Sequence, residues 1–228
     1  VYPGKYPESS KSAIYLQNGP QFVPDSSNAK ILLGLGIVND AVWSDLDADG
    51  YPELITAGHW QPVRIFKNEK GILKNVTKEM GLGGFTGLWN SVQVGDFNGD
   101  GRMDLVAGNW GLNSPYKLSP EKPLNLVFGD INQDGTNELI ESDYNAGVLV
   151  PVRTFKDLAG PMPFLYSQFK SFRQFSRASV AQVLGDTQAK ARLLSVQTLH
   201  SCVFINEGNG FRMVNLPEAV QWAPTTVS

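Results

Sequence analysis

One acidic loop pattern occurs three times along the chain and constrains the fold more than any other feature. Each copy has oxygen-bearing side chains at its first, third and fifth positions, Gly at the sixth and a carboxylate at the ninth; the copies begin at Asp45, Asp96 and Asp130. The first two copies start 51 residues apart, and the third follows 34 residues later. Repeats at intervals of about 20 to 50 residues are typical of solenoids, propellers and arrays. The shorter second interval predicts that the third loop occupies a different hairpin of its repeat.

A second, weaker repeat joins two short apolar segments through an Asn and a turn that carries Gly. It occurs at residues 15–22, 65–73 and 204–211. Short segments of this kind around Gly or Asn are typical of β-hairpins. Because most of the chain lacks helical periodicity, the sequence predicts an all-β repeat architecture.

Residues 156–191 are the exception, because apolar side chains recur there near helical spacing. The run lies between the prolines at 161 and 163 and Gly185, which are typical boundaries of helices. It comprises Phe164, Phe169, Phe172, Phe175, Val180, Val183 and Leu184. We therefore expect a short helical insertion in this segment.

The repeat length predicts about four blades of four-stranded antiparallel sheets. Their approximate ranges are 1–36, 37–88, 89–145 and 146–228, within a single β-propeller domain, or a fragment of one, over residues 1–228. Four blades of a larger ring would leave sheet edges exposed. The chain also begins at Val1 without a charged and hydrophobic leader. We expect a piece of a longer protein, or a chain that completes its ring with another chain.

Composition argues against several classes of function. The formal net charge is −3 and the pI is about 5.4, and no basic stripe is present, so a nucleic-acid partner is not expected. No apolar run is long enough for a membrane span. Cys202 is the single cysteine, so no disulfide can form within the chain; its apolar neighbours predict a small buried side chain.

The spacing within the acidic loops favours calcium. Alternate residues of a tight loop point toward one centre, Gly at the sixth position permits a sharp reversal, and the carbonyl at the seventh can add a neutral ligand. Calcium takes six to eight oxygen ligands with loose geometry, and carboxylates this close together repel one another without a cation. The alternative is a solvated acidic turn, which three copies of the same spacing disfavour.

Two further interpretations of the loops and their surroundings were weighed. Glu141 falls at the twelfth position of the third loop, as in an EF-hand, but short strand-like runs flank this loop where an EF-hand has long helices. Trp60 and Trp110 occupy equivalent repeat positions, which favours packing between blades over a carbohydrate platform. His59, beside Trp60, is interpreted as a structural histidine.

The sequence contains none of the common catalytic motifs. A Gly-x-Ser-x-Gly elbow, a His-Glu-x-x-His motif and a phosphate-binding loop are all missing, and residues 81–86 break the dinucleotide fingerprint at its last glycine. Catalysis by dispersed carboxylates leaves no such trace and stays open. We expect a protein that is not an enzyme.

The three loops, written Asp-x-(Asp/Asn)-x-Asp-Gly-x-x-(Asp/Glu)-Leu-(Ile/Val), resemble the FG-GAP/VCBS repeats of integrin-α-type propellers. Residues 3–8, 109–113, 206–211 and 221–224 extend the likeness to the secreted VCBS-repeat proteins of the ASPIC/UnbV and cartilage-acidic-protein-like group. The resemblance implies a secreted or surface-attached bacterial protein, with a propeller of about seven blades whose hairpins are stiffened by calcium.

The same resemblance implies up to three Ca²⁺ sites, carried over position by position, with the seventh residue contributing its carbonyl. The implied ligands are Asp45, Asp47, Asp49, Tyr51 and Glu53 in the first loop, Asp96, Asn98, Asp100, Arg102 and Asp104 in the second, and Asp130, Asn132, Asp134, Thr136 and Glu138 in the third. Glu replaces the more usual Asp at the ninth position of the first and third loops, and the last quarter of the chain has no intact loop.

These features together predict a non-catalytic, calcium-stabilised extracellular propeller module that binds a protein or glycan partner, as in adhesion. The alternative is part of a secreted polysaccharide-acting enzyme whose catalytic residues lie in the insertions at 110–123 and 156–191 or in missing blades. An intracellular calcium sensor is disfavoured by the strands that flank the loops.

Overall fold

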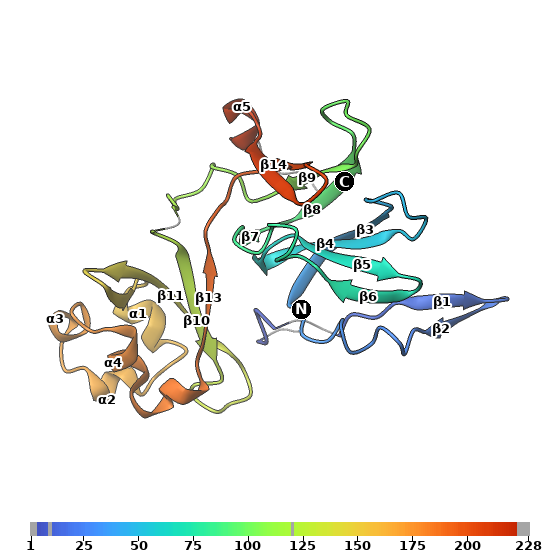
Figure 1. Ribbon diagram of the computed structural model, residues 1–228. Coiled ribbons are helices and arrows are strands. Elements are labelled where there is room, and N and C mark those ends of the chain that lie inside the picture. Colours follow the sequence, from blue (N-terminus) through green and yellow to red (C-terminus); the bar gives the residue numbers. More distant parts are fainter. Residues whose placement is uncertain (1–3, 9–10, 120, 223–228) are drawn as a thin grey trace. The chain divides into compact units, whose positions relative to one another are not determined.

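The computed structural model describes residues 4–8, 11–119 and 121–222, which form two compact units (Figure 1). Unit 1 contains the described parts of residues 8–117 and 198–228, and unit 2 contains those of residues 2–7 and 118–197. Pro3, Ala223 and Pro224, which belong to stretches that carry the family resemblance, lie outside the described residues.

The first sheet of unit 1 is built from consecutive antiparallel strands. Its order is β3 (Ile37–Ser44), β4 (Glu53–Gln61), β5 (Arg64–Glu69) and β6 (Ile72–Asn75), and the short strand β7 (Gly87–Leu88) also pairs with β4. Lys70 and Gly71 form the two-residue β5–β6 turn, and both have positive φ angles, 54° and 95°. A Gly fits such a turn because it adopts positive φ at little cost.

The second sheet of unit 1 combines two separated parts of the sequence. β8 (Ser91–Gly95) pairs with β9 (Asp104–Gly108), β9 pairs with β14 (Cys202–Asn206), and β14 pairs with β15 (Phe211–Asn215). Residues 109–201 are therefore inserted between the second and third strands of one sheet. The predicted ranges 89–145 and 146–228 do not each correspond to a sheet, because β14 rather than the next strand in sequence completes the hydrogen bonding of β9.

The two sheets of unit 1 share one hydrophobic core. Ile55 of β4, Leu105 of β9, Phe204 of β14 and the indole of Trp89 are fully buried in it. The Trp89 and Phe204 rings lie edge to face with centroids 5.8 Å apart, and the Trp89 N–H donates to the Phe85 carbonyl at 3.2 Å. Such pairs add to the stability that burial of their area provides.

The expectation for Cys202 is confirmed, whereas that for one tryptophan is wrong. Cys202 is buried in the shared core, and burial raises the pKa of its thiol. Trp110 is 45% exposed. Its repeat equivalent, Trp60, precedes the short β4–β5 connection, whereas Trp110 lies at the start of the inserted segment and is not covered by a following strand of its own sheet.

Shorter elements complete unit 1. β1 (Tyr15–Asn18) and β2 (Gln21–Pro24) form a two-stranded hairpin. Asn28, which follows this hairpin, donates to the Gly71 carbonyl and accepts from the Leu73 N–H, both at 2.8 Å. The helix α5 (Glu218–Gln221) places the buried Gln221 amide against the backbone of Ser201.

Unit 2 is a four-stranded antiparallel sheet packed against short helices. The strand order is β12 (Val148–Pro151), β11 (Glu138–Asn145), β10 (Leu124–Gly129) and β13 (Arg192–Val196). Between β12 and β13 lie α1 (Phe155–Ala159), α2 (Leu165–Gln168), α3 (Phe172–Phe175), α4 (Val180–Leu184) and the 3₁₀ helix η1 (Gly185–Lys190). Phe155, Leu165, Phe175 and Val183 of these helices pack on Ile140 of the sheet.

The predicted fold class is confirmed by these sheets and helices. Both units are built on four-stranded antiparallel sheets, one of which also carries the short β7, and the helices of unit 2 fall within or next to the predicted segment 156–191. The number of blades in a closed ring stays a prediction. Among the described residues, no helix combines the length and apolar character that a bilayer crossing requires.

Candidate metal centres

Each acidic loop joins two neighbouring antiparallel strands. Loop 1 (residues 45–53) links β3 to β4, loop 2 (96–104) links β8 to β9, and loop 3 (130–138) links β10 to β11. Loops 1 and 2 each connect an edge strand, β3 or β8, to an inner strand, whereas loop 3 connects the two inner strands of its sheet. This difference confirms that the third loop occupies a different hairpin, and the flanking strands exclude the EF-hand interpretation.

The backbone of each loop reverses at two residues with positive φ. The Gly at the sixth position has φ of 87° in Gly50, 84° in Gly101 and 88° in Gly135. No atom lies within 4 Å of where a Cβ would stand at these glycines, so the requirement is conformational rather than one of space. The fourth position also has positive φ; it is Gly99 in loop 2 but Ala48 and Gln133 in the other loops.

The Asp at the first position holds the loop backbone. Asp45 accepts from the N–H groups of Asp49 and Gly50 at 3.1 and 3.0 Å. Asp96 accepts from Gly99, Asp100 and Gly101 at 2.7 to 3.1 Å. These bonds gather the N–H groups on one side and leave the side chains at the third and fifth positions on the exposed part of the loop.

The carboxylate at the ninth position is buried in all three loops and fastens the second position. Glu53 accepts from Leu46 N–H, Asp104 from Phe97 N–H and Glu138 from Ile131 N–H, at 2.8, 3.0 and 2.8 Å. Burial raises the pKa of Glu53. These contacts show a structural role for the ninth position, and its ligation of a metal stays a prediction.

Loop 1 brings three carboxylates together. One oxygen of each of Asp45, Asp47 and Asp49 lies within 4.8 Å of the others, and this is the one such group of three His, Cys, Asp or Glu side chains in the described ranges. In the other loops Asn98 and Asn132 replace the Asp at the third position.

The carboxylates at the fifth position are held in the ionised form. The backbone N–H of Tyr51 lowers the pKa of Asp49, and that of Arg102 lowers the pKa of Asp100. The Thr136 hydroxyl, which donates at 2.6 Å, lowers the pKa of Asp134. All three are ready to bind a cation without first losing a proton.

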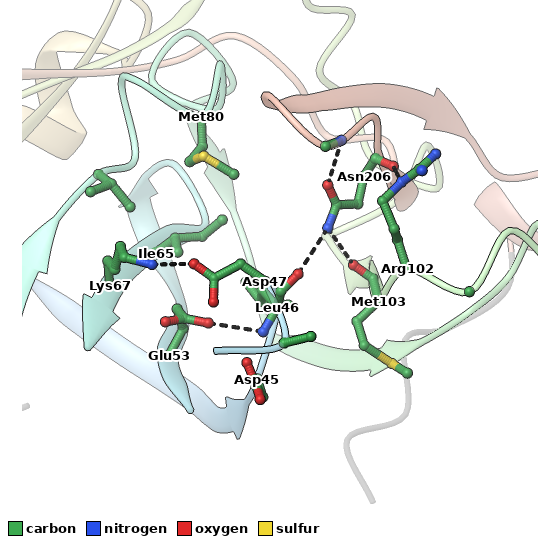
Figure 2. Close-up of a pocket in the computed structure, with 14 residues that line it drawn as sticks. Asp45, Leu46, Asp47, Glu53, Ile65, Lys67, Met80, Arg102, Met103 and Asn206 are labelled. Atoms are coloured by element: carbon green, nitrogen blue, oxygen red, sulfur yellow. Dashed lines mark hydrogen bonds and ion pairs between the residues drawn. The ribbon is translucent and has the colours of Figure 1, made fainter. Parts of the chain in front are cut away.

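Loops 1 and 2 each hold a protein cation against their carboxylates. Figure 2 shows the pair that Lys67 forms with Asp47 in loop 1. The Lys67 ammonium from β5 pairs with Asp47 and lies 3.3 Å from Asp49, and these contacts, the bond to Asp47 first, raise the pKa of Lys67. In loop 2, the Arg102 guanidinium pairs with Asp100. A cation therefore already belongs to the charge balance of both loops.

Loop 3 instead has an acceptor without a hydrogen bond. Asp130 Oδ2 accepts from Gly135 N–H at 3.2 Å, whereas its Oδ1 is buried and makes no hydrogen bond with any described residue. A buried acceptor of this kind is costly unless it finds a partner.

The donor sets of the three loops fit calcium. They offer carboxylate, amide and carbonyl oxygens in a loop whose turns are already formed, and hard cations prefer such ligands. The free Oδ1 of Asp130 and the three carboxylates of loop 1 are the two local features that a cation would satisfy. Residues 45, 47, 49, 96, 98, 100, 130, 132 and 134 would supply side-chain oxygens, and residues 51, 102 and 136 their carbonyls.

Two asparagines that fasten the loops were not recognised as site residues in the sequence. The Asn68 side chain donates to the Pro52 carbonyl at 2.9 Å, and its N–H donates to Glu53 at 3.3 Å. In the second sheet, Asn206 donates in the same way to the Met103 carbonyl at 3.1 Å and to Asp104 at 2.8 Å. The weaker repeat around Asn was the signal that could have identified them.

The two histidines lie away from the loops. His59 Nε2 is 3.0 Å from the Asn90 side-chain oxygen, and the backbone N–H of His200 donates to the Thr198 hydroxyl at 3.2 Å. The His200 contact is local, and the His59 bond, which joins β4 to Asn90, agrees with the interpretation of His59 as a structural residue.

Comparison with known proteins finds one family model that matches part of the chain. Residues 45–107 match the family model of the FG-GAP-like repeat. No curated protein and no solved structure matches the chain. The matched segment runs from the start of loop 1 through β4, β5 and loop 2 into β9. The chain therefore contains an FG-GAP-like repeat, as the acidic loops predict, whereas its likeness to the ASPIC/UnbV group stays a prediction.

Proposed function

We propose that the chain is a calcium-stabilised, non-catalytic binding module of a secreted or cell-surface protein, and that its partner is a protein or a glycan. The observation that carries the proposal is the group of three carboxylates in loop 1, whose oxygens lie within 4.8 Å of one another in a preformed loop. The FG-GAP-like repeat over residues 45–107 supports the same reading.

Calcium would act in this module as a staple. Each loop ties two strands of a four-stranded sheet, and unit 1 has no disulfide because the chain has one cysteine. A cation that bridges the first, third and fifth positions would replace the repulsion between their carboxylates with attraction. Sites of extracellular modules bind calcium with Kd of about 0.1–1 mM, so they are filled outside cells.

Isothermal titration calorimetry of the chain, stripped with EDTA, tests the proposal. We expect calcium to bind with Kd of about 0.1–1 mM and magnesium to bind far more weakly, because Mg²⁺ requires a small, regular octahedral site. Asp47→Ala should remove the site of loop 1 and leave the loop folded, because the Asp47 carboxylate pairs with Lys67 and accepts no hydrogen bond from the described loop backbone. Asp47→Asn is the matched control and should keep the site, since Asn98 and Asn132 occupy this position in the other loops.

Two results would count against the module. The metal site would be contradicted if calcium addition released or absorbed no heat of binding, or if the heat of binding were unchanged in Asp47→Ala. Release of product from a polysaccharide by the calcium-loaded chain would contradict the non-catalytic role, whereas retention on a glycan or protein array without turnover would support it.

A further inference from the structure

Unit 1 contains a pocket between the two acidic loops and the β14–β15 turn. Its volume is about 400 Å³, and loop 1, loop 2, β5 and the turn at Asn206–Gly208 all contribute to its lining (Figure 2). This volume is within the range of about 300–1,000 Å³ that small ligands occupy. No residue of loop 3, the candidate metal centre of unit 2, lines the pocket.

The apolar side chains that line the pocket are aliphatic. Ile65, Val76 and Met80 line it, together with Leu46 and Met103, and no aromatic residue is among its lining residues. Sugars are commonly held against aromatic rings, whereas an aliphatic wall favours an aliphatic side chain through burial of apolar area. This lining therefore favours a peptide over a glycan.

Two cations also line the pocket. The Lys67 ammonium pairs there with Asp47 and Asp49, and the Arg102 guanidinium pairs with Asp100. The Arg102 Nε–H also donates to the Asn206 carbonyl at 2.9 Å. This second bond holds the guanidinium beside the pocket even when Asp100 no longer pairs with it.

Both cations are paired with carboxylates that are expected to bind calcium. A calcium ion on Asp47 and Asp49 would repel the Lys67 ammonium and withdraw the charge that holds it. A calcium ion on Asp100 would free the Nη2 group of the Arg102 guanidinium, while the Nε–H would stay hydrogen-bonded to the Asn206 carbonyl. Of the carboxylates that line the pocket, Asp45 and Asp47 would be balanced by the calcium ion of loop 1, and Glu53 accepts from the N–H groups of Leu46 and Asn68.

We propose that the calcium-loaded pocket binds a peptide segment that carries an aliphatic side chain next to a carboxylate. The aliphatic group would lie on Ile65, Val76 and Met80, and the carboxylate would pair with Lys67 and Arg102. This inference rests on the proposed function, because calcium frees the two cations. Charge-assisted bonds of a carboxylate to Lys and Arg then supply both affinity and selection.

NMR titration of ¹⁵N-labelled chain with N-acetyl-leucine tests this proposal. In 10 mM calcium we expect saturable shifts of the amide signals of Ile65, Lys67 and Asn206. N-acetyl-leucinamide, which has the same side chain without the charge, should bind about tenfold more weakly, as expected for the loss of charge-assisted bonds. In EDTA, the shifts caused by N-acetyl-leucine should fall by a similar factor.

Lys67→Gln and Arg102→Gln should each lower the affinity for N-acetyl-leucine to that for the amide. The heat of calcium binding should persist in both variants. Calcium should bind more tightly to Lys67→Gln, because a competing cation is gone. Lys74→Gln is the matched control; its ammonium pairs with Glu69 on the neighbouring strand and does not line the pocket.

The outcomes separate the two proposals. If calcium binds but the chain binds N-acetyl-leucine no more tightly than its amide, the pocket proposal is overturned and the calcium module stands. Equal binding of N-acetyl-leucine in EDTA, or tighter binding of glucuronate than of N-acetyl-leucine, would also overturn it. Absence of calcium heats would overturn both proposals.

Discussion

Loops 1 and 2 stand on equivalent sheets but are secured by different side chains. In the first sheet, Glu53 reaches the N–H groups of Leu46 and Asn68 at 2.8 and 3.3 Å; in the second, the shorter Asp104 reaches the equivalent N–H groups of Phe97 and Asn206 at 3.0 and 2.8 Å.

The cations also differ between the two loops. Lys67 reaches loop 1 from the third strand of its sheet, whereas Arg102 belongs to loop 2 itself. The two loops therefore have the same backbone conformation, while the cation that balances their carboxylates comes from a different element in each sheet.

The sheets also differ in how their strands are connected. β4 passes to β5 through two residues, whereas β9 and β14 are separated by residues 109–201, which include most of unit 2. β14 and β15 still repeat the hairpin of β5 and β6, since Asn206 and Asn68 stand before the two turns and each donates to a carbonyl of the acidic loop beside it. The family match ends at residue 107, in β9 and just before this insertion begins.

The largest difference between the loops is expected at the ninth position. Asp104 is fully buried and accepts two backbone N–H groups, so Asp104→Asn would set an amide donor against one of them. We expect a loss of about 3 kcal/mol, at the upper end for bonds to a charged group. Glu53→Gln should cost about 1 kcal/mol, because one of its bonds is long and burial raises the pKa of Glu53, which makes its charge costly.

Urea unfolding followed by tryptophan fluorescence measures these losses. All five tryptophans belong to unit 1, so the signal reports on the unit that contains both loops. Glu69→Gln is the control, since this exposed carboxylate pairs with Lys74 on the surface and should change stability by less than about 0.5 kcal/mol. Equal losses at 53 and 104 would break the comparison between the loops.

A smaller difference is expected at the two asparagines. Asn206 is buried and its amide group donates to Met103 and accepts from Gly208, so Asn206→Ala should cost about 2 kcal/mol. Asn68 makes the equivalent bonds to Pro52 and Gly71 nearer the surface, and Asn68→Ala should cost about 1 kcal/mol. The same fluorescence assay measures both losses of stability. A larger loss for Asn68→Ala than for Asn206→Ala would contradict the conclusion that the buried asparagine stabilises its loop more.

The local structure of the loops was readable from the sequence. Gly at the sixth position, Asp at the first and the short apolar runs on both sides predict a tight loop between two strands, and these features depend on nearby residues. The helical insertion was predicted for the same reason, since its apolar spacing is local.

The long-range features were not readable in the same way. The pairing of β9 with β14 joins residues about 100 positions apart, and no local pattern specifies it. The ion pair between Lys67 and Asp47 joins residues 20 positions apart, and the 45% exposure of Trp110 likewise depends on the three-dimensional structure around it. The ninth-position carboxylates were predicted as ligands, and their bonds to the loop backbone became visible only in three dimensions.

The most direct test of the account is thermal unfolding followed by tryptophan fluorescence in EDTA, in 10 mM magnesium and in 10 mM calcium. A ligand that binds only the native state adds RT ln(1 + [L]/Kd), which is about 1.4–2.7 kcal/mol for one site with the expected affinity. We predict a calcium-specific rise in Tm of several degrees that Asp47→Ala and Asp100→Ala together abolish. The same Tm in all three solutions would contradict the account, because the loops would then be acidic turns that bind no calcium.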